Sequence, residues 1–213
     1  YRFQGPTFVD REGLLTASDL GFSGHYNLPG NYGDIHAGIY NGEGYSHPEA
    51  NNEKSFQVRA TLRPLPLGGI WKGLRISGFA DADHYQQSDK RQRYLGQVSY
   101  ESQWVNAAAE YVSTKDRTTI TKAEVDGSGY SLWATPKFGT SGWEALLRHD
   151  ALKPNKDASL KRKRDIAGIA YWFPHMSGVQ TALLADYDST KQSGVTPAPP
   201  KTTLYGIKML INF

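Results

Sequence analysis

Residues 202–213 read TTLYGIKMLINF, and side chains of two different characters alternate along them. One set is apolar and has an aromatic residue at each end: Tyr205, Ile207, Met209, Ile211 and Phe213. The other set is mixed in polarity: Leu204, Gly206, Lys208, Leu210 and Asn212. Successive side chains of a β-strand point to opposite faces, whereas a helix repeats about every 3.6 residues. The alternation therefore predicts a β-strand with one apolar face and one mixed face.

A strand of this kind fits two classes of protein. In a soluble β-protein the apolar face covers a core, and in an outer-membrane barrel it meets lipid while the mixed face meets water. From Tyr205 to Phe213 the strand would extend roughly 27 Å, which a tilt of about 40° reduces to ~20 Å of membrane thickness. That height is close to the ~25 Å apolar band of such barrels. In a barrel, we expect the apolar row ending in Phe213 to be the signal that the barrel assembly machinery reads during insertion.

The composition excludes several other classes of protein. The chain has 213 residues, enough for one large β-domain, and it contains no apolar run long enough for a membrane-spanning helix. Its mean hydropathy of -0.56 is compatible with barrel strands, because their alternation keeps the average low. With no cysteine and six scattered histidines, we expect no disulfide, no metal site and no cofactor. The net charge of +3 is too small to indicate a nucleic-acid partner.

Eleven segments show strand-like alternation, and the connections between them alternate in length. One set is short, with one longer exception at 64–73: 27–31, 64–73, 102–103, 139–142 and 174–178. The other set is longer and polar: 41–54, 86–91, 115–128, 153–164 and 190–201. Outer-membrane barrels have short periplasmic turns and long external loops. Placing Phe213 on the periplasmic side puts every short connection there and every long one outside.

Aromatic residues gather near both ends of the predicted strands, whose centres are mainly aliphatic. Those near the short connections or the terminus are Tyr26, Tyr32, Tyr100, Trp104, Phe138, Trp143, Phe173 and Phe213. Those near the long loops are Tyr40, Tyr94, Tyr111, Tyr130, Tyr187 and Tyr205. Two aromatic girdles are typical of the two membrane interfaces, whereas a soluble sandwich places its aromatics centrally. The sequence thus predicts an all-β fold, a transmembrane antiparallel up-and-down β-barrel in the outer membrane of a Gram-negative bacterium.

The number of strands indicates that the chain is incomplete. Single-chain bacterial barrels have even numbers of strands, so eleven do not close one. Residues 1–3 could add part of a twelfth strand, or the chain could be the C-terminal part of a larger barrel, which we favour. In either case we expect residues 1–213 to form a single barrel domain.

Three stretches resemble the phosphate-selective porin O and P family. They are Val9-Asp10-Arg11-Glu12-Gly13, residues 38–45 (GIYNGEGY) and Ala170-Tyr171-Trp172-Phe173-Pro174, and the terminal strand is also similar. The similarity covers most of the chain, as a pattern rather than a strict motif. It implies a sixteen-stranded, usually trimeric outer-membrane porin whose N-terminal strands are missing here. It does not imply phosphate specificity, because the family's basic pore array has no traceable counterpart in this chain.

The alternation also predicts which charged residues face the lumen. The pore-lining candidates are Arg59, Arg63, Arg75, Asp81, Asp83, Glu110, Lys137, Glu144, Arg148, Asp186 and Lys208. Facing lipid at mid-membrane would cost roughly 2–4 kcal/mol for an arginine or lysine, so these side chains need water. They either select solutes through a transverse field or pair across strands and fill the barrel. Arg59, Arg63 and Arg75 could line an anion path or pair with nearby acids.

Two further groups belong to predicted external loops. Basic residues cluster at Lys90, Arg91, Arg93, Lys161, Arg162, Lys163 and Arg164. They could bind lipopolysaccharide phosphates, attract anions to the mouth, or form solvated loops. The loop 5–19 contains apolar residues that need burial, so it could fold inward and narrow the pore, pack on a neighbouring subunit, or pack on itself.

Signals of an enzyme are weak. Gly139-Thr140-Ser141-Gly142 lacks the strand–helix context of a nucleophile elbow and fits a turn better. His84 and Asp83 lie near the external rim, but the spacing implies no serine partner. We therefore expect a porin, a passive diffusion channel for small hydrophilic solutes or ions, anions among them. Its expected partners are outer-membrane lipid, lipopolysaccharide and two further copies in a trimer. The alternative is a non-conducting barrel that acts in structure, adhesion or scaffolding through its external loops.

Overall fold

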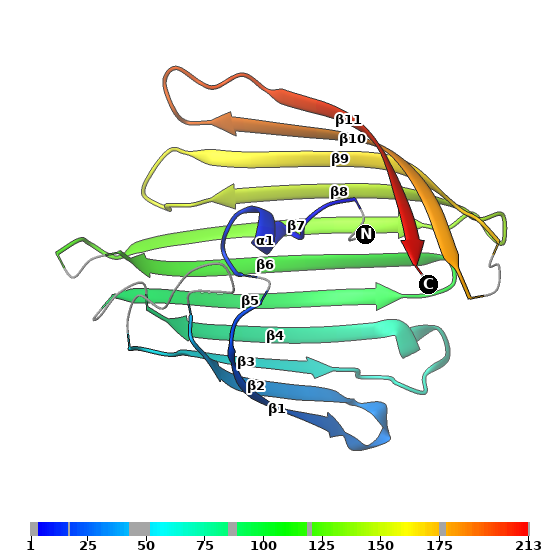
Figure 1. The fold of residues 1–213 in the computed structure, drawn as a ribbon, viewed down its shortest axis with the longest axis horizontal. Coiled ribbons are helices and arrows are strands. Elements are labelled where there is room, and N and C mark those ends of the chain that lie inside the picture. The colour runs from blue at the N-terminus through cyan, green and yellow to red at the C-terminus, as the bar shows by residue number, and fades with distance from the viewer. Residues whose placement is uncertain are drawn as a thin grey trace.

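The computed structural model describes residues 4–16, 18–42, 52–84, 89–118, 121–174 and 178–212. Within them, eleven antiparallel strands form one sheet in which each strand pairs with its neighbours in sequence (Figure 1). The predicted all-β, up-and-down fold is confirmed. The strands are β1 (Gly21–Leu28), β2 (Gly33–Tyr40), β3 (Ser55–Leu62), β4 (Leu74–Asp83), β5 (Lys90–Glu101), β6 (Val105–Arg117), β7 (Val125–Pro136), β8 (Trp143–Lys153), β9 (Lys161–Trp172), β10 (Gln180–Ser193) and β11 (Thr202–Asn212).

Helical structure is confined to short segments in the described residues. They are the one-turn helix α1 (Phe8–Arg11) and the 3-10 turns η1 (Pro29–Asn31) and η2 (Gly69–Gly73). None of the described helices has the length and apolar character needed to cross a membrane.

The turn between β7 and β8 shows how the sequence sets a hairpin. Gly139 and Gly142 have φ angles of 61° and 80°, in the left-handed region that glycine adopts without steric cost. The Phe138 amide donates to the Trp143 carbonyl (2.9 Å), and the Ser141 hydroxyl donates to the Phe138 carbonyl (2.6 Å). Ser141 is therefore a turn residue, in agreement with the prediction.

The connections lie alternately at two ends of the sheet (Figure 1). The short-turn end carries the connections after β1, β3, β5, β7 and β9, and the long-loop end carries the others. Toward the long-loop end the strands are longer than predicted, because β5 begins at Lys90, β9 begins at Lys161, β6 runs to Arg117 and β10 runs to Ser193. These strand ends are polar on both faces, so alternation between apolar and polar residues does not mark them.

The two faces of the sheet invert the pattern of a soluble protein. Large apolar side chains are exposed on the outer face, among them Phe22, Ile39, Phe56, Ile76, Val98, Leu132, Leu147, Ile169, Leu183, Ile207 and Met209. Charged and polar side chains are buried on the inner face, among them Asp81, Arg93, Ser131, Asp150, Arg164, Asp186 and Asp188. Consecutive residues show the contrast directly, since Leu183 is 39% exposed and Leu184 is 0% exposed.

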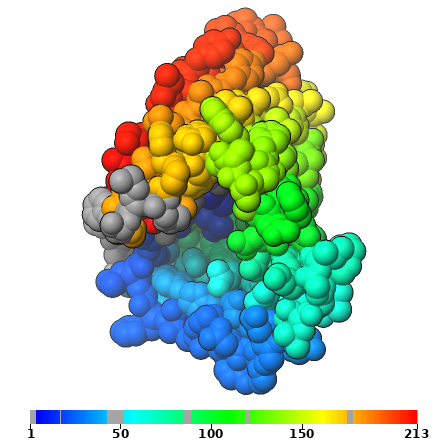
Figure 2. Space-filling view, turned by 90° about the vertical axis from the view of Figure 1, so that its right-hand side faces the viewer, coloured from blue at the N-terminus to red at the C-terminus, as the bar shows by residue number. Residues whose placement is uncertain are grey.

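The sheet curves around its inner face but does not close. Figure 2, which looks at the short-turn end, shows a hollow with the N-terminal segment inside it. Among the described residues, β1 pairs only with β2 and β11 only with β10, so the sheet is open between these two edges. The expected partial strand at residues 1–3 lies outside the described residues.

Candidate functional site

Residues 4–16, which we call the inner segment, lie on the concave face of the sheet. Within the segment, α1 begins after Thr7, whose hydroxyl accepts a hydrogen bond from the Asp10 amide (3.4 Å). The first helical residue, Phe8, is buried against Val112 of β6 and Leu152 of β8. Val9 and Leu14 of the segment, with Leu95 of β5, pack around this cluster. The apolar residues of the predicted loop 5–19 thus find their burial on the inner wall.

Polar contacts fix the inner segment to strands from β5 to β10. On the segment side, Gln4 donates to Asp186 (3.1 Å), Arg11 donates to Thr190 (3.1 Å) and Glu12 accepts from Arg162 (2.7 Å). From the wall, Arg148 donates to the Pro6 carbonyl (3.2 Å) and Arg93 donates to the Leu14 carbonyl (2.8 Å). Of the three packings considered for this loop, the structure shows the inward one.

Most charges of the inner wall are paired, six of the pairs below across neighbouring strands and Arg148–Asp150 within β8. The pairs and their shortest N···O distances are Arg59–Asp34 (3.0 Å), Arg75–Glu101 (2.9 Å), Arg91–Asp83 (3.0 Å), Arg93–Asp116 (2.7 Å), Arg148–Asp150 (2.9 Å), Arg164–Asp188 (2.6 Å) and Lys208–Asp186 (2.6 Å). Strand register brings partners of neighbouring strands together, because Asp83 faces Arg91 and Asp188 lies two positions from the residue facing Arg164. Of the two roles predicted for these charged residues, the structure therefore shows pairing with one another.

The predicted arginine row near the short-turn end does not form a free anion path. Arg59 and Arg75 are each paired with an acid of the neighbouring strand. Arg63 donates to the Asn31 side chain and to the Lys72 carbonyl, which are neutral acceptors. Two of the three guanidinium charges are thus balanced locally.

Other pore-lining candidates hold neutral partners. Asp81 is buried and accepts a 2.7 Å hydrogen bond from the Ser55 hydroxyl. Glu144 accepts from the Trp172 indole (2.6 Å), and Lys137, which faces Glu144 in an isolated bridge, donates to the Ser102 carbonyl (3.1 Å).

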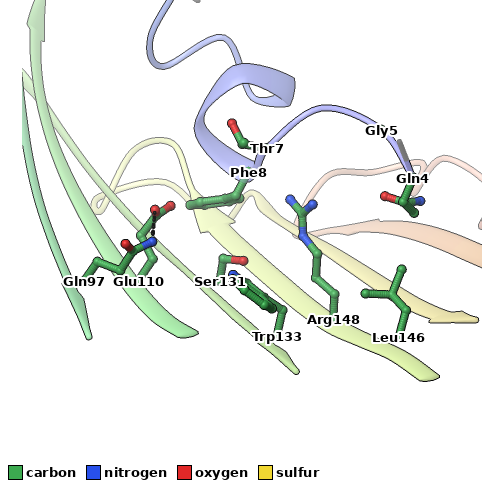
Figure 3. A pocket seen from close by; sticks show the side chains of 10 residues that line it. All are labelled: Gln4, Gly5, Thr7, Phe8, Gln97, Glu110, Ser131, Trp133, Leu146 and Arg148. Atoms are coloured by element: carbon green, nitrogen blue, oxygen red, sulfur yellow. Dashed lines mark hydrogen bonds between the residues drawn. The ribbon is translucent and has the colours of Figure 1, made fainter. Parts of the chain in front are cut away.

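Glu110 differs from the paired acids of the wall. Its one hydrogen bond among the described residues comes from the Gln97 amide, at 3.3 Å. Both residues line a cavity between the inner segment and β5–β8, together with Phe8 and Trp133 (Figure 3). Trp133 was not among the sequence candidates, although an aromatic side chain on the polar face of a strand centre was the signal that could have identified it.

The prediction that the two basic clusters lie in external loops is wrong. Lys90, Arg91 and Arg93 belong to β5, and 161–164 belong to β9. Alternation divides the second cluster, because Arg162 and Arg164 bind acids of the inner side whereas Lys161 and Lys163 are exposed. In the first, Arg91 and Arg93 pair with acids and Lys90 binds Glu124 of the adjoining loop (3.2 Å). The two clusters are rich in charge, as the sequence shows, but the sequence did not reveal that they belong to strands.

The terminal strand has the predicted faces. Tyr205, Ile207, Met209 and Ile211 are exposed on the outer face of β11, and Lys208 reaches Asp186 on the inner side. Phe213 lies outside the described residues.

No group of three or more potential metal-binding side chains occurs among the residues that the structure describes. His84, near the long-loop end, pairs with Glu53 (3.0 Å), and the Asp83 carboxylate accepts from the His84 backbone amide (2.8 Å).

Comparisons of the chain with protein-family models, curated proteins and solved structures gave no match. The resemblance to phosphate-selective porins therefore stays a prediction.

Proposed function

We propose that this chain forms the wall of an outer-membrane barrel in a Gram-negative bacterium and lets small hydrophilic solutes diffuse passively. The observation that carries the proposal is the inversion of the two faces, with apolar side chains exposed outside and charges buried inside. Water outside and a dry core inside would reverse this arrangement. A lipid exterior and a hydrated interior account for both faces, since a lipid-facing arginine or lysine costs roughly 2–4 kcal/mol at mid-membrane.

The open edges set a condition on this proposal. Backbone groups left unpaired in lipid cost several kcal/mol each, so further strands must pair with β1 and β11. A sixteen-stranded, trimeric porin, as the sequence resemblance implies, would meet the condition and cover part of the apolar exterior. We further propose that the barrel assembly machinery reads the β11 apolar row and that exposed Lys161 and Lys163 contact lipopolysaccharide phosphates.

The inner segment would narrow the path that solutes take. It crosses the inner wall from β5 to β10 and leaves a mixed lining of paired charges around it. Such a lining favours small polar solutes over apolar ones. No covalent step and no cofactor are needed for this function.

A non-conducting barrel is the second candidate, favoured by how firmly the inner segment is held. The buried Phe8 anchor and the contacts of Gln4, Arg11 and Glu12 all occupy the inner side. If they block the path completely, only the external surface is left to act.

Single-channel recording in planar bilayers separates the two candidates. The protein is purified from native membranes and measured under a salt gradient. We expect stepwise openings, and a larger step for Phe8→Ala, which weakens the anchor of the inner segment. A folded, heat-modifiable protein that conducts in neither form would refute the channel and leave the structural role.

A further inference from the structure

The cavity beneath the inner segment has a volume of about 250 Å³. Figure 3 shows Phe8 above it, Ser131 and Trp133 on the wall below, Glu110 with Gln97 on one side and Arg148 on the other. It combines two aromatic rings with a small number of polar groups, as small-molecule sites do.

The charges around this cavity do not balance. Arg148 is matched by Asp150, because its Nε lies 2.9 Å from Oδ1 and its terminal nitrogen 2.9 Å from Oδ2 of that residue. Its other terminal nitrogen donates to the Pro6 carbonyl. Glu110 has only the long hydrogen bond from neutral Gln97, and no ion-pair partner in the described part of the chain. Counted over the described residues, the cavity therefore carries one negative charge without an ion-pair partner.

Two donors on the cavity wall are already engaged. The Ser131 hydroxyl donates to Asp150 (2.7 Å), and the Arg148 guanidinium is held by Asp150 and Pro6. An anion would have to break these contacts to bind Ser131 or Arg148, whereas a cation meets a carboxylate with acceptor capacity left. The faces of Phe8 and Trp133 also favour cations, because the quadrupole of an aromatic ring attracts positive charge.

We propose that this cavity is a binding subsite for a small organic cation that carries a primary ammonium group. The ammonium binds Glu110, and the apolar part of the solute packs between Phe8 and Trp133. The small volume limits the ligand to a few carbon atoms. The inference rests on the proposed function in one respect, because a solute reaches the cavity only if the inner side is hydrated.

The test measures binding of n-butylammonium by saturation-transfer NMR to the detergent-solubilised protein from native membranes. Sodium butyrate and n-butanol have the same alkyl chain with the opposite or no charge. We expect n-butylammonium to bind at least about tenfold more tightly than either, because only it gains a charge-assisted bond to Glu110. Equal binding of the three compounds would overturn the proposal.

Two variants locate the site. Glu110→Gln keeps the shape of the side chain and is expected to weaken n-butylammonium about tenfold. Trp133→Leu keeps an apolar contact without a ring and should weaken it about threefold. Glu101→Gln, which removes an inner-side acid paired with Arg75, is the matched control and should leave the affinity unchanged. Unchanged binding in heat-modifiable Glu110→Gln, or an equal loss in Glu101→Gln, would refute the subsite.

Conductance of the same preparation separates this inference from the proposed function. Channel openings without charge-selective binding would refute the subsite and support the porin. Binding that depends on Glu110, without any channel openings, would support the subsite and refute the porin.

Discussion

The strands beneath the inner segment, β8–β10, and the uncovered strands β1–β3 share one pattern of alternation but differ in burial. Both groups carry an arginine–aspartate pair on their inner side. Between β9 and β10, the side chains of Arg164 and Asp188 are 5% and 11% exposed. Between β3 and β2, those of Arg59 and Asp34 are 48% and 23% exposed. The same type of ion pair is therefore buried in one region and exposed to solvent in the other.

The inner segment causes this difference, because the strands of both pairs have a neighbour on each side. It lies over β8–β10, with contacts to Thr190 and Arg162 next to the Arg164–Asp188 pair. Strands β1–β3 have no such cover among the described residues. The outer faces do not differ in kind, since Phe22 in β1 and Leu183 in β10 are both exposed. Alternation along a strand thus determines whether a side chain points to the outer or the inner face. Whether an inner side chain is buried depends on whether the inner segment covers it.

Removing the acid from each pair should produce the largest contrast. Asp188→Ala leaves the Arg164 guanidinium buried without its carboxylate, and we expect a loss of about 3–5 kcal/mol in the free energy of unfolding. Asp34→Ala in the exposed pair should cost no more than about 1 kcal/mol. Denaturant unfolding in lipid vesicles measures both variants. Similar losses would mean that the inner segment does not shield the Arg164–Asp188 pair.

A charge on the outer face tests the other half of the comparison. Leu183→Arg places a guanidinium in the middle of the apolar face of β10, and we expect a loss of roughly 2–4 kcal/mol. Thr203→Arg, on the same face of β11 near the long-loop end, should cost only about 0–1 kcal/mol because the penalty falls toward the membrane interface. Unfolding in vesicles gives both values. A neutral effect of Leu183→Arg would argue against lipid at this face.

Sequence reasoning captured the features that depend on neighbours along the strand. The eleven strands, the facing of Leu183 and Asp186, and the outer row of β11 follow from a period of two residues, which is local. The confirmed turn at Ser141 is local as well.

The features it missed depend on contacts between distant residues. Arg164 was assigned to a loop because its strand end is polar on both faces, and only pairing with β10 shows it to be a strand residue. The choice among three packings for residues 5–19 required the Phe8 contact with Val112 and Leu152, which are more than a hundred residues away. Trp133 gained its importance from the cavity roof that Phe8 supplies.

Loosening the inner segment should give a smaller effect, because it makes the inner face of β8–β10 more exposed, like that of β1–β3. Glu12→Gln removes the charge that Arg162 binds at 2.7 Å, and the partly exposed arginine limits the expected loss to about 1 kcal/mol. Protease cleavage of the segment should become faster, while Asp10→Asn in α1, whose carboxylate contacts no strand among the described residues, serves as the control. Equal cleavage rates for the two variants would show that the Glu12 contact does not hold the segment.

The smallest effect is expected at Glu124, which lies in the loop before β7, beyond both regions compared. The hydrogen bond from Lys90 and its positive charge lower the pKa of this carboxyl below the ordinary value of 4.5. Because the folded-state pKa is the lower one, the pair stabilises the fold above the unfolded pKa, and its contribution disappears as the pH falls through the folded value. The group is fully solvated, so salt should screen the effect. Unfolding of the native protein and of Glu124→Gln, compared at neutral pH and below the folded pKa, measures it. The two proteins should differ slightly at neutral pH and converge in acid; a difference that grows in acid would reverse the sign and exclude this pair as its source.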